Sequence, residues 1–271
     1  MDMSGLLGQF NGTAPEWVIL SLVLILGACI GSFLNVCICR LPESRSIVRP
    51  PSACPRCGAP IRFYDNIPIF SYLLLLGKCR SCKTRISPRY PLVEFLTGLL
   101  AAAAVVRFGL TADFIVYLAF ICALVAITFI DLDQQIIPDV MSLPGIPIGL
   151  ACSVLVSSLT FRDSLIGILI GGGSLFLLAW GYQHFTGKEG MGGGDIKLLA
   201  MIGAFIGWKG VFFTILVSSA TGSVIGLFLM MMAKKDLKFA VPFGPFLSIG
   251  AIAYLFFGPE VIFWYYHRAF V

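Results

Sequence analysis

Long apolar runs separated by short polar connections dominate the sequence. The first extends from about Trp17 to Cys39. Seven more lie at roughly 92–106, 113–131, 140–158, 164–183, 195–208, 210–233 and 243–267. A helix needs about 20 apolar residues to cross a bilayer, so the pattern predicts an all-α polytopic membrane protein with about eight transmembrane helices. The run 195–208 is short, and it either spans fully or lies tilted or interfacial.

The composition supports this fold class. Of 271 residues, 58% are hydrophobic and only 12% are charged, and the mean hydropathy is +0.93. These values exclude an ordinary soluble domain. The N-terminus carries Asp2 instead of basic residues, and its apolar run is long. We therefore expect a first membrane helix there and not a cleaved signal peptide.

The charge distribution predicts an orientation. The polar segment 40–91 holds ten Lys/Arg residues against two acids, Glu43 and Asp65. The positive-inside rule then places this loop in the cytoplasm and the N-terminus outside. Smaller basic groups, Lys188 and Lys234, Lys235 and Lys238, fall in later connections that the same alternation places inside. We divide the chain into residues 1–39, a cytoplasmic domain 40–91, and a seven-helix membrane domain 92–271.

The cytoplasmic domain contains two C-x2-C knuckles, Cys54 with Cys57 and Cys79 with Cys82, separated by 21 residues. Four thiolates from two knuckles can complete a zinc tetrahedron, and a reducing cytosol favours a metal over disulfides. Cysteines fill all four positions, so none is left for a catalytic water. We predict a structural zinc; a redox pair or incidental cysteines are the alternatives.

Two carboxylates at helix ends are the candidate catalytic pair. Asp131 ends one apolar run, and Asp195 opens another 64 residues later, within Gly190-Met-Gly-Gly-Gly-Asp-Ile-Lys197. Intramembrane acids are functional candidates by default. Two neighbouring carboxylates cannot both ionise easily, so one can act as base toward water and the other as acid toward a carbonyl. Gly192, Gly193 and Gly194 would let a peptide backbone approach closely.

Other interpretations of these residues stay open. Asp195 is also a plausible helix N-cap, and carboxylates couple ions in membrane transporters. Lys197 can tune a carboxylate or extend to the membrane surface. Asp133 and Asp139 are weaker candidates, because a solvated connection explains them.

Two other protease chemistries find little support. No H-E-x-x-H motif is present, which argues against a zinc protease. Ser174 follows three glycines, but the only histidines are His184 and His267. His184 lies about 15 Å along the same helix axis, and His267 is expected at the opposite membrane face. Helix packing explains those glycines better.

Taken together, the motifs resemble the type IV prepilin peptidases over nearly the whole chain. Similar segments are Gly31-Ser-Phe-Leu-Asn-Val36 with Arg40-Leu-Pro42, Asp65-Asn-Ile-Pro-Ile69, and Ser87-Pro-Arg-Tyr-Pro-Leu-Val-Glu94. The resemblance implies eight membrane helices and membership of the GxGD aspartic membrane proteases. Its catalytic pair corresponds to Asp131 and Asp195.

The resemblance also implies a function. Family members remove the leader of prepilins and pseudopilins on the cytoplasmic side of the inner membrane. Those with four loop cysteines generally also N-methylate the new N-terminal residue, usually phenylalanine, with S-adenosylmethionine. Membrane lipids are further expected partners, and nucleic acid is not. A carboxylate-coupled transporter or a non-catalytic assembly factor is the alternative function.

Some properties have no readable signal in the sequence. No residue pattern identifies the binding site of the methyl donor (cofactor-binding residues: unknown), because no Rossmann-like glycine fingerprint follows a strand. Glu43 and Glu94 flank the loop and could bind an amine or a ribose, although helix-end electrostatics explains them equally well. The pilin that is processed, the oligomeric state, and any coupling between cleavage and methylation are likewise not encoded in a recognisable pattern.

Overall fold

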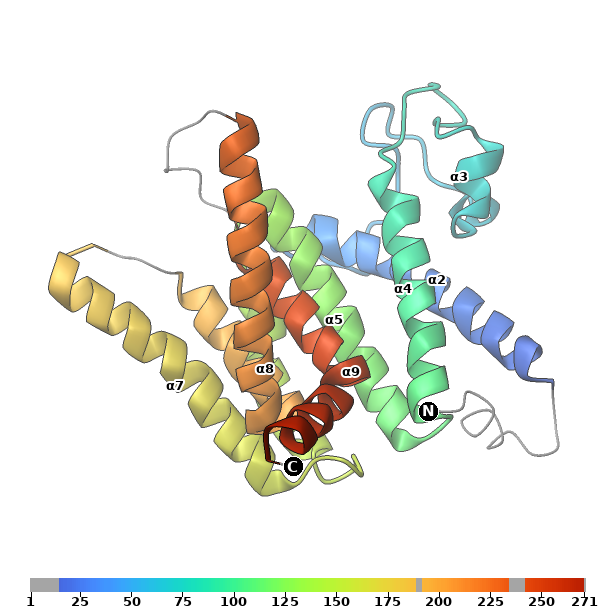
Figure 1. Ribbon diagram of the computed structural model, residues 1–271. Coiled ribbons are helices and arrows are strands. Elements are labelled where there is room, and N and C mark those ends of the chain that lie inside the picture. Colours follow the sequence, from blue (N-terminus) through green and yellow to red (C-terminus); the bar gives the residue numbers. More distant parts are fainter. Residues whose placement is uncertain (1–14, 189–191, 234–241, 271) are drawn as a thin grey trace. The chain divides into compact units, whose positions relative to one another are not determined.

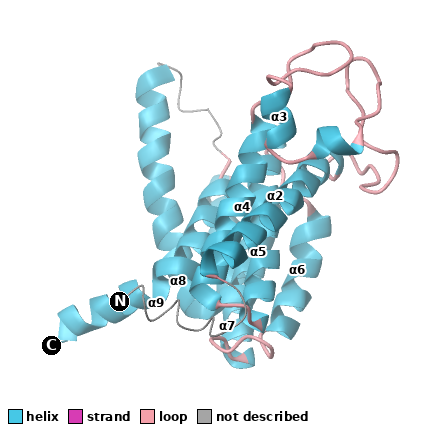
Figure 2. Ribbon diagram, turned by 90° about the vertical axis from the view of Figure 1, so that its right-hand side faces the viewer, coloured by secondary structure: helices cyan, strands magenta, loops and turns pink. Residues whose placement is uncertain are grey.

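The computed structural model describes residues 15–188, 192–233 and 242–270, and this part of the chain is mostly helical (Figures 1 and 2). It contains no β-strand; two isolated antiparallel bridges join Ala53 with Pro60 and Lys78 with Arg85. The predicted all-α architecture is therefore confirmed. Residues used in the predictions above that lie outside the described ranges are Asp2, Gly190, Met191, Lys234, Lys235 and Lys238.

Six of the described helices are long and apolar enough to cross a membrane. They are α2 (Glu16–Arg40), α4 (Arg89–Phe108), α5 (Ala112–Gln134), α7 (Phe161–Thr186), α8 (Gly193–Ala233) and α9 (Gly244–Phe270). A shorter apolar helix, α6, covers Asp139–Cys152. Because α8 consists of two helices joined at a break, the described chain agrees with the expectation of about eight apolar helical segments.

The run predicted at 140–158 is helical only as far as Cys152. Pro144 and Pro147 lie inside this helix, and just beyond its end the Ser153 hydroxyl donates to the Leu150 carbonyl at 2.7 Å. Such a local bond competes with the helical ladder. Fourteen residues rise about 21 Å, so α6 is shorter than the ~30 Å hydrocarbon layer.

The chain packs as two compact units, Met1–Ala126 and Ile127–Val271, with the boundary inside α5. The first unit also holds a 3-10 helix, η1 (Phe63–Asn66), and the short helix α3 (Phe70–Leu74). The three-part division of the chain at residues 39 and 91 was drawn from where the sequence is polar and not from packing, so it stays a prediction.

In the first unit, α2 and α4 approach each other through small residues. A Cβ atom added to Gly27 would lie 2.7 Å from the Ala101 Cβ, and one added to Gly31 would lie 2.7 Å from the Glu94 Cα. The Asn35 amide, buried between the helices, donates to the Tyr90 carbonyl at 3.0 Å. Small residues at such contacts are typical of membrane helix pairs, and they fix the start of α4 against the end of α2.

In the second unit, α7 and α8 pack backbone against backbone. Gly167 faces Gly203, and a Cβ atom at Gly171 would lie 2.5 Å from the Leu199 carbonyl oxygen. The buried Ser164 hydroxyl donates to the Ala204 carbonyl at 2.7 Å. The first half of α8, which begins near the candidate site, is therefore held along α7.

The break in α8 lies at Gly207, where φ is 70° and ψ is 178°. This is a left-handed conformation that glycine adopts readily, and a Cβ atom here would lie 2.9 Å from Leu159 Cδ1. The next residue, Trp208, donates its indole N–H to the Asp163 carboxylate at 3.0 Å. The element α8 (Figure 1) is thus two helices joined at Gly207, which agrees with the boundary predicted between the runs 195–208 and 210–233.

Candidate functional site

Asp131 lies in the last turn of α5, and its side chain is buried, with the residue only 5% exposed. Its Oδ2 atom accepts a hydrogen bond of 3.0 Å from the backbone N–H of Gly244, the first residue of α9. A helix N-terminus presents unpaired N–H groups and a partial positive charge, both of which favour a carboxylate. The start of α9 therefore orients the Asp131 carboxylate.

Asp195 is the third residue of α8 and is partly buried. Gly194, the residue before it, packs against Ile137, and Ile137 also packs against Gly244, whose N–H donates to Asp131. The segments that carry the two acids therefore meet at the same residue within the second unit. Carboxylates that approach each other closely tend to share a proton.

Ile137 lies where three elements meet around these acids. A Cβ atom at Gly194 would lie 3.0 Å from the Ile137 Cβ, and one at Gly244 would lie 3.4 Å from its Cδ1. The chain after α5 therefore contacts the first turns of both α8 and α9. Among the described residues, no atom lies within 4 Å of a Cβ added to Gly192 or Gly193, so this part of the chain leaves space beside them.

The Lys197 side chain forms an ion pair with Asp139. Its Nζ lies 2.7 Å and 2.9 Å from the two carboxylate oxygens of Asp139. Asp139 is the first residue of α6, so this ion pair ties α6 to the first turn of α8, which carries Asp195. Asp139 was expected to be only a solvated residue of the connection, and its ion pair with Lys197 was not predicted.

The serine-protease alternative gains no support from the structure. The Ser174 hydroxyl donates to the Gly171 carbonyl in its own helix at 3.2 Å. His184 is exposed and stacks on Trp180, with 5.5 Å between ring centroids. Both side chains have local explanations.

The four loop cysteines converge in the first unit. The sulfur atoms of Cys54, Cys57, Cys79 and Cys82 all lie within 4.8 Å of one another, and Cys54 and Cys82 are 3.8 Å apart. A tetrahedral zinc–thiolate site, with Zn–S bonds of about 2.3 Å, requires S···S separations of roughly 3.8 Å. The four predicted ligands thus lie close enough together to hold a zinc ion.

Both knuckles have the same backbone design. The N–H of Cys54 donates to the Ala59 carbonyl at 2.9 Å, and the N–H of Cys79 donates to the Thr84 carbonyl at 2.8 Å. Hydrogen bonds from the side chain and backbone of Thr84 lower the pKa of the Cys82 thiol to about 6. The pKa of the neighbouring Cys57 thiol is raised instead, to about 11, so the four thiols ionise as one interacting set.

An ion pair fastens the second knuckle to the segment before it. Arg80, between Cys79 and Cys82, makes a two-point contact with Asp65, with Arg80 Nε and one terminal nitrogen 2.6–3.1 Å from the carboxylate oxygens. The hydrogen bonds from Arg80 lower the pKa of Asp65. Asp65 lies in η1, so the pair fixes η1 against the cysteine cluster.

The two glutamates that flank the loop have separate partners. Glu43 forms an ion pair of 2.7 Å with Arg45. Glu94 is buried and accepts a hydrogen bond of 2.7 Å from the backbone N–H of Ile69, just before α3. Both observations favour structural roles over the binding of an amine or a ribose.

Reasoning from the sequence missed Gly244. Its contribution is a backbone N–H, which every residue except proline possesses, so residue type gave no direct signal. The segment Pro242-Phe-Gly-Pro245 does contain an indirect one. Proline in the first turn marks a helix start, and a glycine beside it permits a close approach of another group.

Comparisons with known proteins identify related sequences. Residues 25–108 match the bacterial peptidase A24 N-terminal domain, and residues 118–227 match the type IV leader peptidase family. Similar curated relatives are each called prepilin leader peptidase/N-methyltransferase. That of Pseudomonas putida is 37% identical, covering 94% of this chain and 96% of the relative. That of Aeromonas salmonicida is 39% identical, with 92% and 94% covered, and that of Pseudomonas aeruginosa is 40% identical, with 88% and 90% covered.

No solved structure matches the chain significantly. The sequence similarity nevertheless extends over most of the chain and of each relative, and it includes both the cysteine loop and the two aspartate segments. The chain therefore belongs to the type IV leader peptidase family.

Proposed function

We propose that this protein is a membrane aspartic endopeptidase that removes the leader of prepilins and pseudopilins and then N-methylates the new N-terminal residue. The observation that carries the proposal is geometric: Ile137 packs against both Gly194, which precedes Asp195 in α8, and Gly244, which donates to Asp131 at the end of α5. A transporter or an assembly factor needs no such pair beside an open glycine segment. The names of the curated relatives support both activities.

In the proposed cleavage, one carboxylate accepts a proton from water while the other donates a proton to the oxygen of the scissile carbonyl. The water oxygen bonds to the carbonyl carbon. The C–N bond then breaks, and the leaving nitrogen takes up a proton. The hydrogen bond from Gly244 orients Asp131 for this step, and the open space at Gly192 and Gly193 gives room for the substrate backbone.

The four cysteines are proposed to hold a structural zinc. Their sulfur positions fit a closed tetrahedral site, and a zinc ion bound there would stabilise a loop that has little apolar interior. For the second activity, S-adenosylmethionine would supply the methyl group to the free α-amine. The loop is proposed to face the cytoplasm, where both the prepilin leader and the methyl donor are available.

Asp131→Ala and Asp195→Ala, made separately, test the peptidase proposal. Each variant should lose leader removal by at least about a thousandfold, because neither carboxylate can perform both proton transfers alone. The assay uses purified protein and a model prepilin, and membrane extraction verifies insertion. Normal cleavage by either inserted variant would disprove the pairing. Wild-type protein that cleaves nothing in this assay would favour a transporter or an assembly factor.

A further inference from the structure

The loop carries an exposed apolar edge that the peptidase site does not explain. Phe70, Leu73, Leu74 and Leu76, in and just after α3, are 57%, 63%, 68% and 82% exposed. Contiguous apolar side chains of this size are costly in water and usually mark a contact surface. The position of α3 relative to α4 indicates what covers them.

The start of α3 is held beside the first turns of a membrane helix. The Ile69 N–H donates to Glu94, which lies five residues after Arg89 at the start of α4. Five residues rise about 7.5 Å. The whole of α4 has 20 residues and a length of about 30 Å, which matches the hydrocarbon thickness of a bilayer. Figure 1 shows α3 next to the loop end of α4. The apolar edge therefore lies near the membrane surface, at the depth of an interfacial helix.

Two cations lie beside this edge without an acidic partner. Lys78 and Arg85 form an antiparallel bridge, so their side chains project from the same face of the second knuckle. Directly opposed like charges destabilise such a pair. The equivalent bridge in the first knuckle joins Ala53 and Pro60, which are uncharged. No described carboxylate forms an ion pair with Lys78 or Arg85, whereas Arg80 and Arg45 are both paired. An anion between Lys78 and Arg85 would offset their repulsion.

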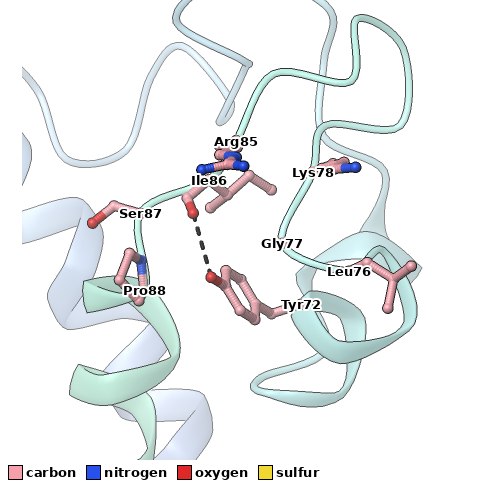
Figure 3. A pocket seen from close by; sticks show the side chains of 8 residues that line it. All are labelled: Tyr72, Leu76, Gly77, Lys78, Arg85, Ile86, Ser87 and Pro88. Carbon is pink, nitrogen blue, oxygen red and sulfur yellow. Dashed lines mark hydrogen bonds between the residues drawn. The ribbon is translucent and has the colours of Figure 1, made fainter.

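A hollow of about 600 Å³ lies next to these cations (Figure 3). Its lining includes Tyr72, Leu76, Lys78, Arg85, Ser87 and Pro88. The Tyr72 hydroxyl donates to the Ile86 carbonyl at 3.4 Å and packs on Gly77, where an added Cβ would lie 2.9 Å from the tyrosine oxygen. Pro88 directly precedes α4. The hollow thus lies where α4 begins, with cations on one wall and an exposed leucine on another.

We propose that this hollow binds the phosphate headgroup of an anionic phospholipid, with Lys78 and Arg85 on the phosphate and the α3 leucines among the acyl chains. The inference rests on the chain crossing the membrane and not on its peptidase activity. The methyl donor is a poorer match, because its sulfonium and ammonium groups outnumber its carboxylate, and the lining contains two cations and no acid.

The test is lipid retention by the full chain. Protein in nanodiscs of phosphatidylcholine, with or without phosphatidylglycerol, is released and analysed by native mass spectrometry. Wild-type protein should retain phosphatidylglycerol in preference to phosphatidylcholine. Each cation near an anionic surface contributes about a fivefold gain in affinity, so Lys78→Ala with Arg85→Ala should weaken retention by about thirtyfold. The control, Arg49→Ala with Lys83→Gly, removes the same charge from the same loop and should retain the lipid.

Equal retention by the Lys78/Arg85 double variant and by wild type would overturn the site. So would displacement of the lipid by inorganic phosphate, because the hollow would then be a soluble-anion site. Zinc content reports whether the loop is intact. Should the double variant lose zinc, the single variants Lys78→Gln and Arg85→Gln decide the question, each with an expected loss of about fivefold. None of these readouts requires leader cleavage, so a failure here is distinct from a failure of the peptidase proposal.

Discussion

At the scale of single residues, Gly244 has the most restricted role in the proposed site. A Cβ atom added there would lie 2.6 Å from Asp131 Oδ2, closer than any normal contact. We expect Gly244→Ala to displace the Asp131 carboxylate and to reduce leader cleavage by about a hundredfold, since a shift of about 1 Å in a catalytic group has that effect. A prepilin cleavage assay on purified protein measures the change.

Gly181→Ala is the matched control for this substitution. Gly181 lies in α7, and an added Cβ would have no atom within 4 Å, so cleavage should stay at the wild-type rate. If Gly244→Ala also cleaves at that rate while remaining folded, then the hydrogen bond from α9 does not position Asp131 for catalysis.

A second residue-scale prediction concerns how Asp65 affects zinc release at different pH values. Arg80 lowers the pKa of Asp65 in the folded protein. The stability that this ion pair adds is therefore fully present above the pKa of an unfolded aspartate, about 4. It is lost as the pH falls through the lower pKa of the folded protein. Asp65→Asn should therefore speed zinc release by the same factor at about pH 6 and about pH 8. A chelator-competition assay measures release, and a factor that changes between these pH values would refute the assignment.

Gly244 and Asp65 also indicate how far sequence reasoning reaches. The sequence was sufficient to group the four cysteines, because residue type and spacing carry that signal. It also proposed Asp131 and Asp195 as a pair, from residue type and helix position alone. It gave no partner for Asp65 or Glu94. Their contacts, to Arg80 and to the backbone of Ile69, depend on how the loop folds back on itself.

At the scale of helices, the Lys197–Asp139 pair connects α6 to the start of α8. Both side chains are partly exposed, 36% and 57%, so the pair contributes at most about 1 kcal/mol to stability. We expect Lys197→Met to leave the unfolding temperature nearly unchanged but to lower the cleavage rate, because the first turn of α8 carries Asp195. Thermal unfolding in detergent and the prepilin assay together measure the two effects.

The exchanged pair, Asp139→Lys with Lys197→Asp, should recover part of the lost rate if the role of Lys197 is to join the two helices. An exchanged variant no more active than Lys197→Met would instead indicate that the lysine charge itself acts on Asp195.

Most helices were predictable at this scale, and the exceptions have physical causes. Hydropathy placed α2 and α9 to within a few residues, since a membrane span requires a long apolar run. It overestimated α6, which ends at Cys152, where the next residue, Ser153, bonds its hydroxyl to the Leu150 carbonyl. It also missed α3, which is only five residues long and lies in a polar loop.

At the scale of the whole molecule, the cysteine cluster and the aspartate pair belong to different compact units. Removal of zinc by a chelator should therefore leave most of the helical content in place, because the long helices are stabilised by their apolar surroundings. The loop should become sensitive to trypsin, since it contains many Lys and Arg residues and loses its metal support. Circular dichroism and limited proteolysis measure these outcomes.

Cys79→Ser should reproduce the effect of the chelator on the loop, whereas Asp195→Ala should retain one zinc per chain. A general collapse of helix content on zinc removal would contradict the separation of the two units.

The break at Gly207 has a consequence for biosynthesis. The Asp163 carboxylate, which accepts the Trp208 N–H beside the break, also accepts a hydrogen bond from Thr160 at the beginning of α7. Asp163 is translated 44 residues before Gly207. The acceptor for Trp208 is therefore already present when the ribosome reaches the glycine. The contact that sets the bend in α8 therefore needs no residue later than Trp208, whereas the packing of its second half against α9 comes afterwards.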